Sequence, residues 1–236
     1  NLGRWSEADL SHIISSASLI DTPGAQIASL SNHFVATSYA ANTLVGGPQV
    51  AEQLVVNLDG FDCFTFLDVI EALRRASDSE AFIKELKNVR YVGGKVAYVN
   101  RRHFFSDWIA EDAVVEDVTE KVGQGRALKV RKQLNRKADG SFWLPGLVVT
   151  PRQIHYIPTA NVDTDILSSL QPGDYIGIYT NQVGLDVSHT GLIVKSQGRV
   201  LLRHASSRRD TGRVVDEDLL EYMQNKPGLL VYRVKP

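Results

Sequence analysis

Hydrophobic residues near the start of the chain recur with the spacing of amphipathic helices. Leu10, Ile13 and Ile14 fall on one stripe, after a serine that is suited to cap a helix. Beyond a Pro-Gly pair, residues 27–35 repeat the same pattern of apolar positions. The pattern therefore predicts a helical N-terminal region that covers residues 1–50.

A longer amphipathic pattern surrounds the only cysteine of the chain. A turn-forming Asp-Gly pair and a further aspartate, Asp62, precede a stretch that predicts a helix over residues 62–76. The inward positions of this helix are Cys63, Phe66, Ile70 and Leu73. The sequence over residues 79–88 predicts another helix.

The last third of the chain changes to short runs that are rich in β-branched and aromatic residues. Pro-Gly, Asn- and Gly-containing turns separate these runs, as is typical of consecutive strands. The predicted strands are residues 148–149, 154–157, 174–180, 190–195, 200–203 and 229–234. An earlier β candidate lies at 52–57. The stretch 111–145 is polar and rich in lysine and arginine, and we expect it to be an insertion outside the core.

Helices followed by strands predict an α+β fold rather than alternating βαβ units. We expect the helix that carries Cys63 to pack on a mostly antiparallel sheet. The length of 236 residues suits one large domain, so residues 1–236 are predicted to form a single unit. A hydrophobic content of 43% is enough for a proper core.

The charge balance and hydropathy narrow the classes of partner. A formal net charge of −1 gives no reason to expect binding to nucleic acid or to an anionic membrane surface. The longest apolar runs are far shorter than a transmembrane helix requires. The chain starts at Asn1 instead of methionine, which predicts that an upstream segment was removed, by processing or by trimming.

Cys63 is the candidate for covalent chemistry. It lies in the first turn of its predicted helix, where unpaired backbone N–H groups favour a thiolate. The alternative is an inert core residue, since an unpaired cysteine is often simply a small buried hydrophobe. A nucleophilic role would require a nearby base and a polar group that orients this base.

Two of the six histidines are suited to supply those groups. A hairpin around residues 195–198 would pair Val194 with Arg199 and would place His189 directly opposite His204. Side chains at opposite positions of two strands share a face of the sheet, so the two imidazoles could act as base and orienter. A zinc site with Cys63 lacks the usual close ligand spacing, and we predict neither a metal nor a cofactor.

The order of short motifs resembles that of the NlpC-type superfamily of papain-like cell-wall cysteine hydrolases. In that superfamily an Asp-Cys pair opens a helix, and a Pro-Gly-Asp turn and two histidine-bearing strands follow. The corresponding motifs here are Asp62-Cys63, Gln171-Pro-Gly-Asp174, Ser188-His-Thr-Gly191 and His204-Ala-Ser-Ser207. The resemblance implies a papain-like core, in which helices pack on a half-barrel of mostly antiparallel strands and the catalytic cysteine starts a helix.

Within that superfamily, the chain looks most similar to a branch of N-acetylmuramoyl-L-alanine amidase-like enzymes. The shared marks are Asp62-Cys63-Phe-Thr65-Phe66, Arg101-Arg-His-Phe-Phe-Ser-Asp107-Trp108 and Gly184-Leu-Asp186-Val-Ser-His189. The resemblance implies cleavage of the amide between sugar and stem peptide in peptidoglycan fragments, in the periplasm or outside the cell. A γ-glutamyl D,L-endopeptidase, a thiol acyltransferase and a non-catalytic wall-binding module remain alternatives.

The resemblance also implies a role for each matching residue. Cys63 would be the nucleophile, His189 the general base and His204 the group that orients it. Tyr39 would help to bind the oxyanion. The candidate substrate-binding residues are Asp62, Arg102, Trp108 and Asp186. For Asp62 a helix N-cap is the competing interpretation, and for Trp108 it is core packing.

Overall fold

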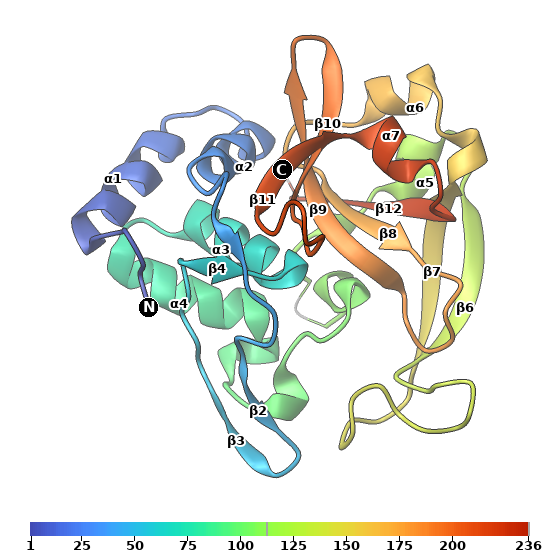
Figure 1. Cartoon of the computed structure of the whole chain (residues 1–236), viewed down its shortest axis with the longest axis horizontal. Coiled ribbons are helices and arrows are strands. Elements are labelled where there is room, and N and C mark those ends of the chain that lie inside the picture. The colour runs from blue at the N-terminus through green and yellow to red at the C-terminus, as the bar shows by residue number, and fades with distance from the viewer. Residues whose placement is uncertain (112, 236) are drawn as a thin grey trace.

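The computed structural model describes residues 1–111 and 113–235. In it, a layer of helices packs against an antiparallel sheet of eight strands (Figure 1). The four long helices all precede the sheet in sequence: α1 (Glu7–Ser18), α2 (Pro23–Asn32), α3 (Cys63–Arg75) and α4 (Ser79–Arg90). Each begins after a side chain that accepts a hydrogen bond from the first turn, which satisfies backbone donors that the helix itself leaves unpaired.

The main sheet has the strand order β11-β10-β9-β8-β12-β7-β6, and β5 pairs with β12 at its side. All its pairings are antiparallel. The strands are β5 (Glu116–Asp117), β6 (Leu128–Leu134), β7 (Thr150–Pro158), β8 (Tyr175–Tyr179), β9 (Val187–Ser196), β10 (Arg199–Ala205), β11 (Val214–Asp218) and β12 (Gly228–Arg233).

Shorter elements connect these layers. Next to the helical layer, β1 (Ser38–Tyr39) pairs in parallel with β4 (Gly60–Phe61), and β2 (Val45–Gly47) forms a hairpin with β3 (Val50–Gln53). The short helices are α5 (Thr119–Gly123), α6 (Thr164–Ser169) and α7 (Leu219–Met223). Single 3₁₀ turns are η1 (Val92–Gly94), η2 (Tyr98–Asn100), η3 (Phe105–Ile109) and η4 (Thr159–Asn161).

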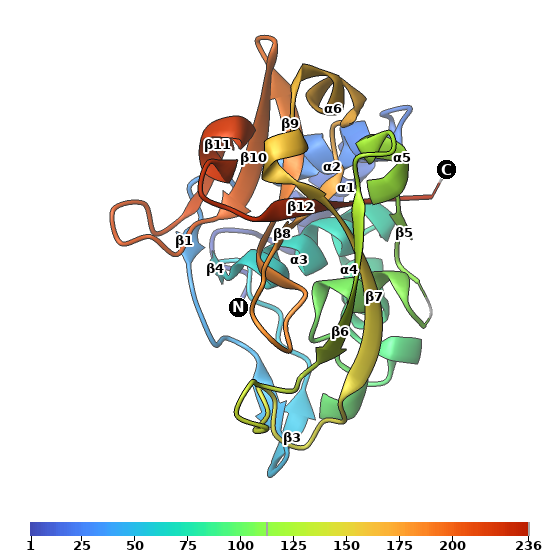
Figure 2. The ribbon, with the colours of Figure 1, turned by 90° about the vertical axis from the view of Figure 1, so that its right-hand side faces the viewer.

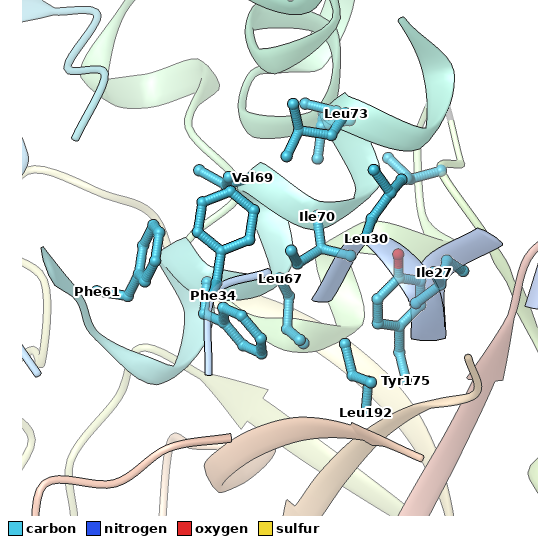
Figure 3. Packing of buried hydrophobic residues seen from close by; sticks show 14 of the residues in the cluster. Ile27, Leu30, Phe34, Phe61, Leu67, Val69, Ile70, Leu73, Tyr175 and Leu192 are labelled. Carbon is cyan, nitrogen blue, oxygen red and sulfur yellow. The ribbon is translucent and has the colours of Figure 1, made fainter. Parts of the chain in front are cut away.

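The sheet is buried on both faces, so its strands separate two hydrophobic cores. Tyr175, Leu192 and Leu230 belong to the core under α1–α4, and Figure 3 shows Tyr175 and Leu192 beneath the helical side chains. The alternate residues of the same strands, such as Ile176 and Ile193, pack against α5, α6 and α7. Successive side chains of each strand thus point to opposite faces of the sheet and divide the apolar residues between the two cores. The core on one face packs α3 against the sheet.

Most predicted elements form near their expected positions. Of the helical region predicted for residues 1–50, helices form only at Glu7–Ser18 and Pro23–Asn32, whereas Ser38–Tyr39 and Val45–Gly47 are strands. The cysteine helix and the antiparallel sheet both occur, although the β candidate at 52–57 forms only at Val50–Gln53. The expectation that 111–145 lies outside the core is wrong for Leu128–Leu134. This segment is strand β6, and it pairs with β7 along its whole length (Figure 2).

The polar composition of β6 explains why its sequence does not indicate a strand of the main sheet. The positions that alternate toward solvent carry charged residues such as Lys129 and Arg131, whereas Leu134 is fully buried. Lys132 is buried too, and its ammonium group donates hydrogen bonds to the carbonyls of Thr180 and Gln182. A strand that buries a lysine stem has a weak hydrophobic signal, although it belongs to the main sheet.

Candidate active site

Cys63 is the first residue of α3, and the residue before it caps the helix. The Oδ1 atom of Asp62 accepts hydrogen bonds from the backbone N–H groups of Phe64 (3.0 Å) and Thr65 (2.7 Å). The Thr65 hydroxyl in turn accepts from the N–H of Asp62 at 3.0 Å. This reciprocal capping box fixes where the helix begins and therefore where the thiol lies. The carboxylate of Asp62 acts as an N-cap in this structure.

The surroundings of the thiol oppose ionisation at rest, contrary to the expectation of a preformed thiolate. Burial raises the pKa of the Cys63 thiol, and the negative charge of Asp62 raises it further, while hydrogen bonds from Thr190 act in the opposite direction. The helix terminus favours an anion, but the residue that caps this terminus is itself an anion. Cys63 therefore needs a base to take its proton.

Strands β9 and β10 form the expected hairpin, but with a different register. Gln197 and Gly198 have positive φ angles of 49° and 76°, and they make a two-residue turn that pairs Ser196 with Arg199. The predicted pairing of Val194 with Arg199 is therefore wrong by two residues. Because a shift of two residues keeps every side chain on its face, His189 and His204 still meet, as diagonal neighbours.

The two histidines form a direct hydrogen bond that continues to a carboxylate. Nε2 of His189 lies 2.7 Å from Nδ1 of His204, and the rings meet edge to face with centroids 4.8 Å apart. Nε2 of His204 lies 2.8 Å from an Oε atom of Glu217 on β11. Arg208 donates to the other carboxylate oxygen of Glu217. No sequence motif marks Glu217, because only the pairing of β10 with β11 brings it near the histidines.

Burial keeps both histidines neutral. It lowers the pKa of His189 to about 3, with smaller contributions from His204 and the positive charge of Lys226. Burial also lowers the pKa of His204, although Glu217 acts against this effect. An imidazole with a low pKa carries no charge near pH 7, so the nitrogen without a hydrogen can accept a proton.

A cavity of about 310 Å³ opens between the start of α3 and the start of β9. Cys63 and His189 both line it, beside aromatic and aliphatic residues that include Phe64, Phe105 and Trp143. Thr190, the residue after His189, donates from its hydroxyl to the Cys63 carbonyl at 2.8 Å and so ties β9 to α3. The cysteine and the histidine therefore share one concave site, which is the usual form of a small-molecule pocket.

Two tyrosines lie near the thiol. Tyr39 on β1 pairs with Phe61 on β4, and β4 leads directly into Asp62 and Cys63. Burial raises the pKa of Tyr39, and the charges of Cys63 and Asp62 add to the effect. Tyr222 was not foreseen. Its ring on α7 lies 5.0 Å from that of His204 and 6.0 Å from that of His189, and burial raises its pKa to about 12.

Three residues expected to contact substrate have side chains that make internal contacts in this fold. Trp108 is fully buried and packs against Phe64 and Tyr175, so the expectation that it lines a cleft is wrong. Arg102 is 3% exposed and donates to backbone carbonyls, including those of Asn88 and Val89. Core packing and internal hydrogen bonds occupy these side chains.

Asp186 is likewise 2% exposed, and it accepts hydrogen bonds from the backbone N–H groups of Ser106 and Val187. Asp186 is among the residues that line the cavity, and its carboxylate connects the η3 turn to the start of β9. Within residues 1–111 and 113–235, no cluster of three histidine, cysteine or acidic side chains has the arrangement of a metal site. No described helix combines the length and apolarity needed to cross a bilayer.

Comparison with known proteins places this geometry in a family. The AmiA-like family, described as N-acetylmuramoyl-L-alanine amidase-like, matches residues 29–229. An N-acetylmuramoyl-L-alanine amidase from Bacteroides uniformis is similar with a TM-score of 0.75 and 27% identity, over 91% of this chain and 99% of that one. A protein from Legionella pneumophila shares the fold, with a TM-score of 0.80 and 24% identity over 98% and 94% of the two chains. No curated protein sequence matches significantly. Because the family match covers most of the chain, this protein belongs to the AmiA-like family.

Proposed function

We propose that this protein is a cysteine amidase that hydrolyses the bond between N-acetylmuramic acid and L-alanine in peptidoglycan fragments, outside the cytoplasm. The observation that carries the proposal is one cavity lined by the only cysteine and by a neutral histidine, which hydrogen-bonds to a second histidine. Membership in the AmiA-like family supports the choice of substrate. A thiol, a base and an orienting group are the parts that covalent amide hydrolysis requires.

In the proposed reaction, Cys63 attacks the lactyl carbonyl of the muramic acid while its proton passes to His189. The S–H bond breaks, an N–H bond forms on the imidazole, and sulfur bonds to the carbonyl carbon. Collapse of the tetrahedral intermediate expels the amino group of L-alanine, which takes the proton from His189, and leaves a thioester. Water, deprotonated by His189, then attacks the thioester and releases the sugar acid and the free thiol.

The developing oxyanion requires hydrogen-bond donors. The backbone N–H of Cys63 belongs to the first turn of α3, where N–H groups have no acceptor within the helix. Tyr39 lies close enough for a charge on Cys63 to raise the pKa of its hydroxyl, and this hydroxyl would be the second donor. Loss of one such donor in other hydrolases typically costs a factor of roughly 10²–10³ in rate.

Substitution of Cys63 by alanine tests the proposal directly. We expect Cys63→Ala and Cys63→Ser both to abolish cleavage of defined muropeptides, because neither has a thiol, while circular dichroism and thermal unfolding remain close to wild type. Mass spectrometry of the products identifies the bond. Amidase action releases the intact stem peptide with a free L-alanine amino group.

Other products would point to the alternatives. Cleavage after the second residue of the stem peptide would indicate an endopeptidase, and transfer to an added amine would indicate an acyltransferase. Tight binding without turnover by the wild-type protein would favour a wall-binding module. Full turnover by Cys63→Ala would rule out the cysteine mechanism.

A further inference from the structure

The histidine pair ends at a carboxylate that no motif predicted. Glu217 lies on β11, whose residues pair with β10, and it accepts from Nε2 of His204 at 2.8 Å. His204 is 1% exposed, so its ring is buried in this contact, while the side chain of Glu217 is partly exposed. Arg208 donates to the second carboxylate oxygen of Glu217 and holds the carboxylate in place from the solvent side.

The direction of each hydrogen bond follows from counting protons. An ionised carboxylate can only accept, so the nitrogen of His204 that faces Glu217 must carry hydrogen. A neutral imidazole has one N–H, and Nδ1 of His204 is therefore an acceptor. The neighbouring Nε2 of His189, 2.7 Å away, must then donate. The only nitrogen of His189 without hydrogen is consequently Nδ1.

We propose that Glu217 is a positioning residue that fixes the tautomers of both histidines and leaves Nδ1 of His189 free to accept a proton. The proposal deepens the proposed function, because this nitrogen would be the base for Cys63. When the S–H bond breaks and an Nδ1–H bond forms, His189 becomes an imidazolium that still donates to His204. No proton needs to move to Glu217, whose charge stabilises the imidazolium across His204.

Other charged groups also face the histidine pair and enter any pH profile. Arg208 and Asp216 act on His204 from β10–β11, with opposite signs. Lys226 acts on His189 from the segment after α7 and lies over the ring of Tyr222. These groups influence the charge of the histidines through space. Among the described side chains that hydrogen-bond to the pair, Glu217 contacts the nitrogen of His204 that faces away from His189, and this contact determines which ring nitrogens carry hydrogen.

The variants for the test differ in charge and in donor ability. Glu217→Gln keeps the size but removes the charge and can present an N–H₂ donor to His204, which permits the opposite tautomer. Glu217→Asp keeps an acceptor-only carboxylate. The matched control is Asp210→Asn, which removes a carboxylate from the exposed connection between β10 and β11, where its side chain contacts Thr211.

Nitrogen-15 NMR of the wild-type protein at pH 7 tests the assignment without any substrate. We expect Nε2–H on both His189 and His204. Detection of an Nδ1–H on either ring would overturn the proposal, and this readout stands even if no variant folds. In Glu217→Gln we expect mixed or reversed tautomers, whereas Asp210→Asn should keep the wild-type signals.

Alkylation of Cys63 by iodoacetamide gives a functional readout that is independent of muropeptides. We expect Glu217→Gln to slow alkylation at pH 7 by about 10-fold to 100-fold and to move the acidic limb of the pH profile to lower pH, with Glu217→Asp partly restoring both. Muropeptide cleavage should fall in kcat, with little change in KM. An unchanged pH profile in Glu217→Gln would contradict the proposal. A wild-type protein with the expected tautomers but no amidase activity would instead contradict only the proposed function.

Discussion

At the scale of single residues, the unusual feature is that the cysteine and histidine of the proposed catalytic set are both neutral at rest. Burial lowers the pKa of His189 and raises that of Cys63, so neither group is charged at rest near pH 7. In a thiolate–imidazolium pair both groups would be charged before the substrate arrives. The charges of this site would form only when the thiol attacks, which makes the orientation of the base especially important.

The pKa of His189 predicts a dependence of stability on pH. Because the folded-state pKa is about 3 and the unfolded value is near 6.5, the unfolded chain binds more protons between these values. The contribution of the buried neutral His189 to the free energy of unfolding is fully present above pH 6.5. It is lost as the pH falls through this window, at up to about 1.4 kcal/mol per pH unit.

Urea unfolding at pH 7.5 and pH 5 measures this effect. We expect the free energy of unfolding of the wild type to fall by about 2 kcal/mol more than that of His189→Gln over this range. His12→Gln replaces an exposed histidine of α1 and serves as the control. Equal losses in the wild type and His189→Gln would mean that His189 is not buried in its neutral form.

At the scale of elements, one residue at the start of α3 affects both the capping of the helix and the ionisation of the thiol. Asp62 accepts from two N–H groups of the first turn and also raises the pKa of Cys63. The same side chain therefore stabilises the helix and opposes ionisation of the thiol. These two effects can be separated, because asparagine caps a helix about as well as aspartate but carries no charge.

Substitutions of Asp62 separate capping from charge. We expect Asp62→Asn to keep nearly all the stability and to lower the pKa of Cys63, so that iodoacetamide alkylation at pH 7 becomes faster. Asp62→Ala should lower the thiol pKa and also cost about 1 kcal/mol of stability. Asp78→Ala removes the cap of α4 and should cost a similar amount without changing alkylation. Identical alkylation in Asp62→Asn and the wild type would contradict the assigned charge effect.

The β9–β10 hairpin marks the limit of prediction for an element. The sequence alone predicts that His189 and His204 lie on the same face of the hairpin, because changing the loop length by an even number of residues leaves both side chains on that face. The sequence does not predict the register of the two strands, since a four-residue and a two-residue turn are both compatible with Lys195-Ser-Gln-Gly198. The positive φ angles of Gln197 and Gly198 select the shorter turn.

At the scale of the whole molecule, Arg203 connects the sheet to the helical layer. Its guanidinium donates twice to Asp216 on β11 and reaches the Ser31 hydroxyl of α2 at 3.0 Å. The side chain is almost fully buried. The histidine hairpin and the helical layer are thus held together by a hydrogen bond from a charged side chain in addition to apolar packing.

Loss of this connection predicts a large decrease in stability. We expect Arg203→Met to lower the free energy of unfolding by about 2 kcal/mol, because the buried Ser31 hydroxyl and the partly exposed carboxylate of Asp216 lose hydrogen bonds from a charged donor. Arg199→Met, on the same strand, removes an exposed ion pair with Asp218 and should change stability by less than about 1 kcal/mol. Urea denaturation of both variants checks the contrast. A similar small effect in both would mean that Arg203 does not hold the layers together.

The sequence by itself determined the local features: the capped helix that begins at Cys63, the antiparallel strands and the shared face of His189 and His204. These depend on neighbours in the chain, namely a capping aspartate, period-two alternation and turn residues. Only the tertiary structure decided the burial of Trp108, the place of β6 in the sheet and the contact of Glu217 with His204. Such features depend on which distant strands pair, and one chain's local pattern does not encode the partner of a strand.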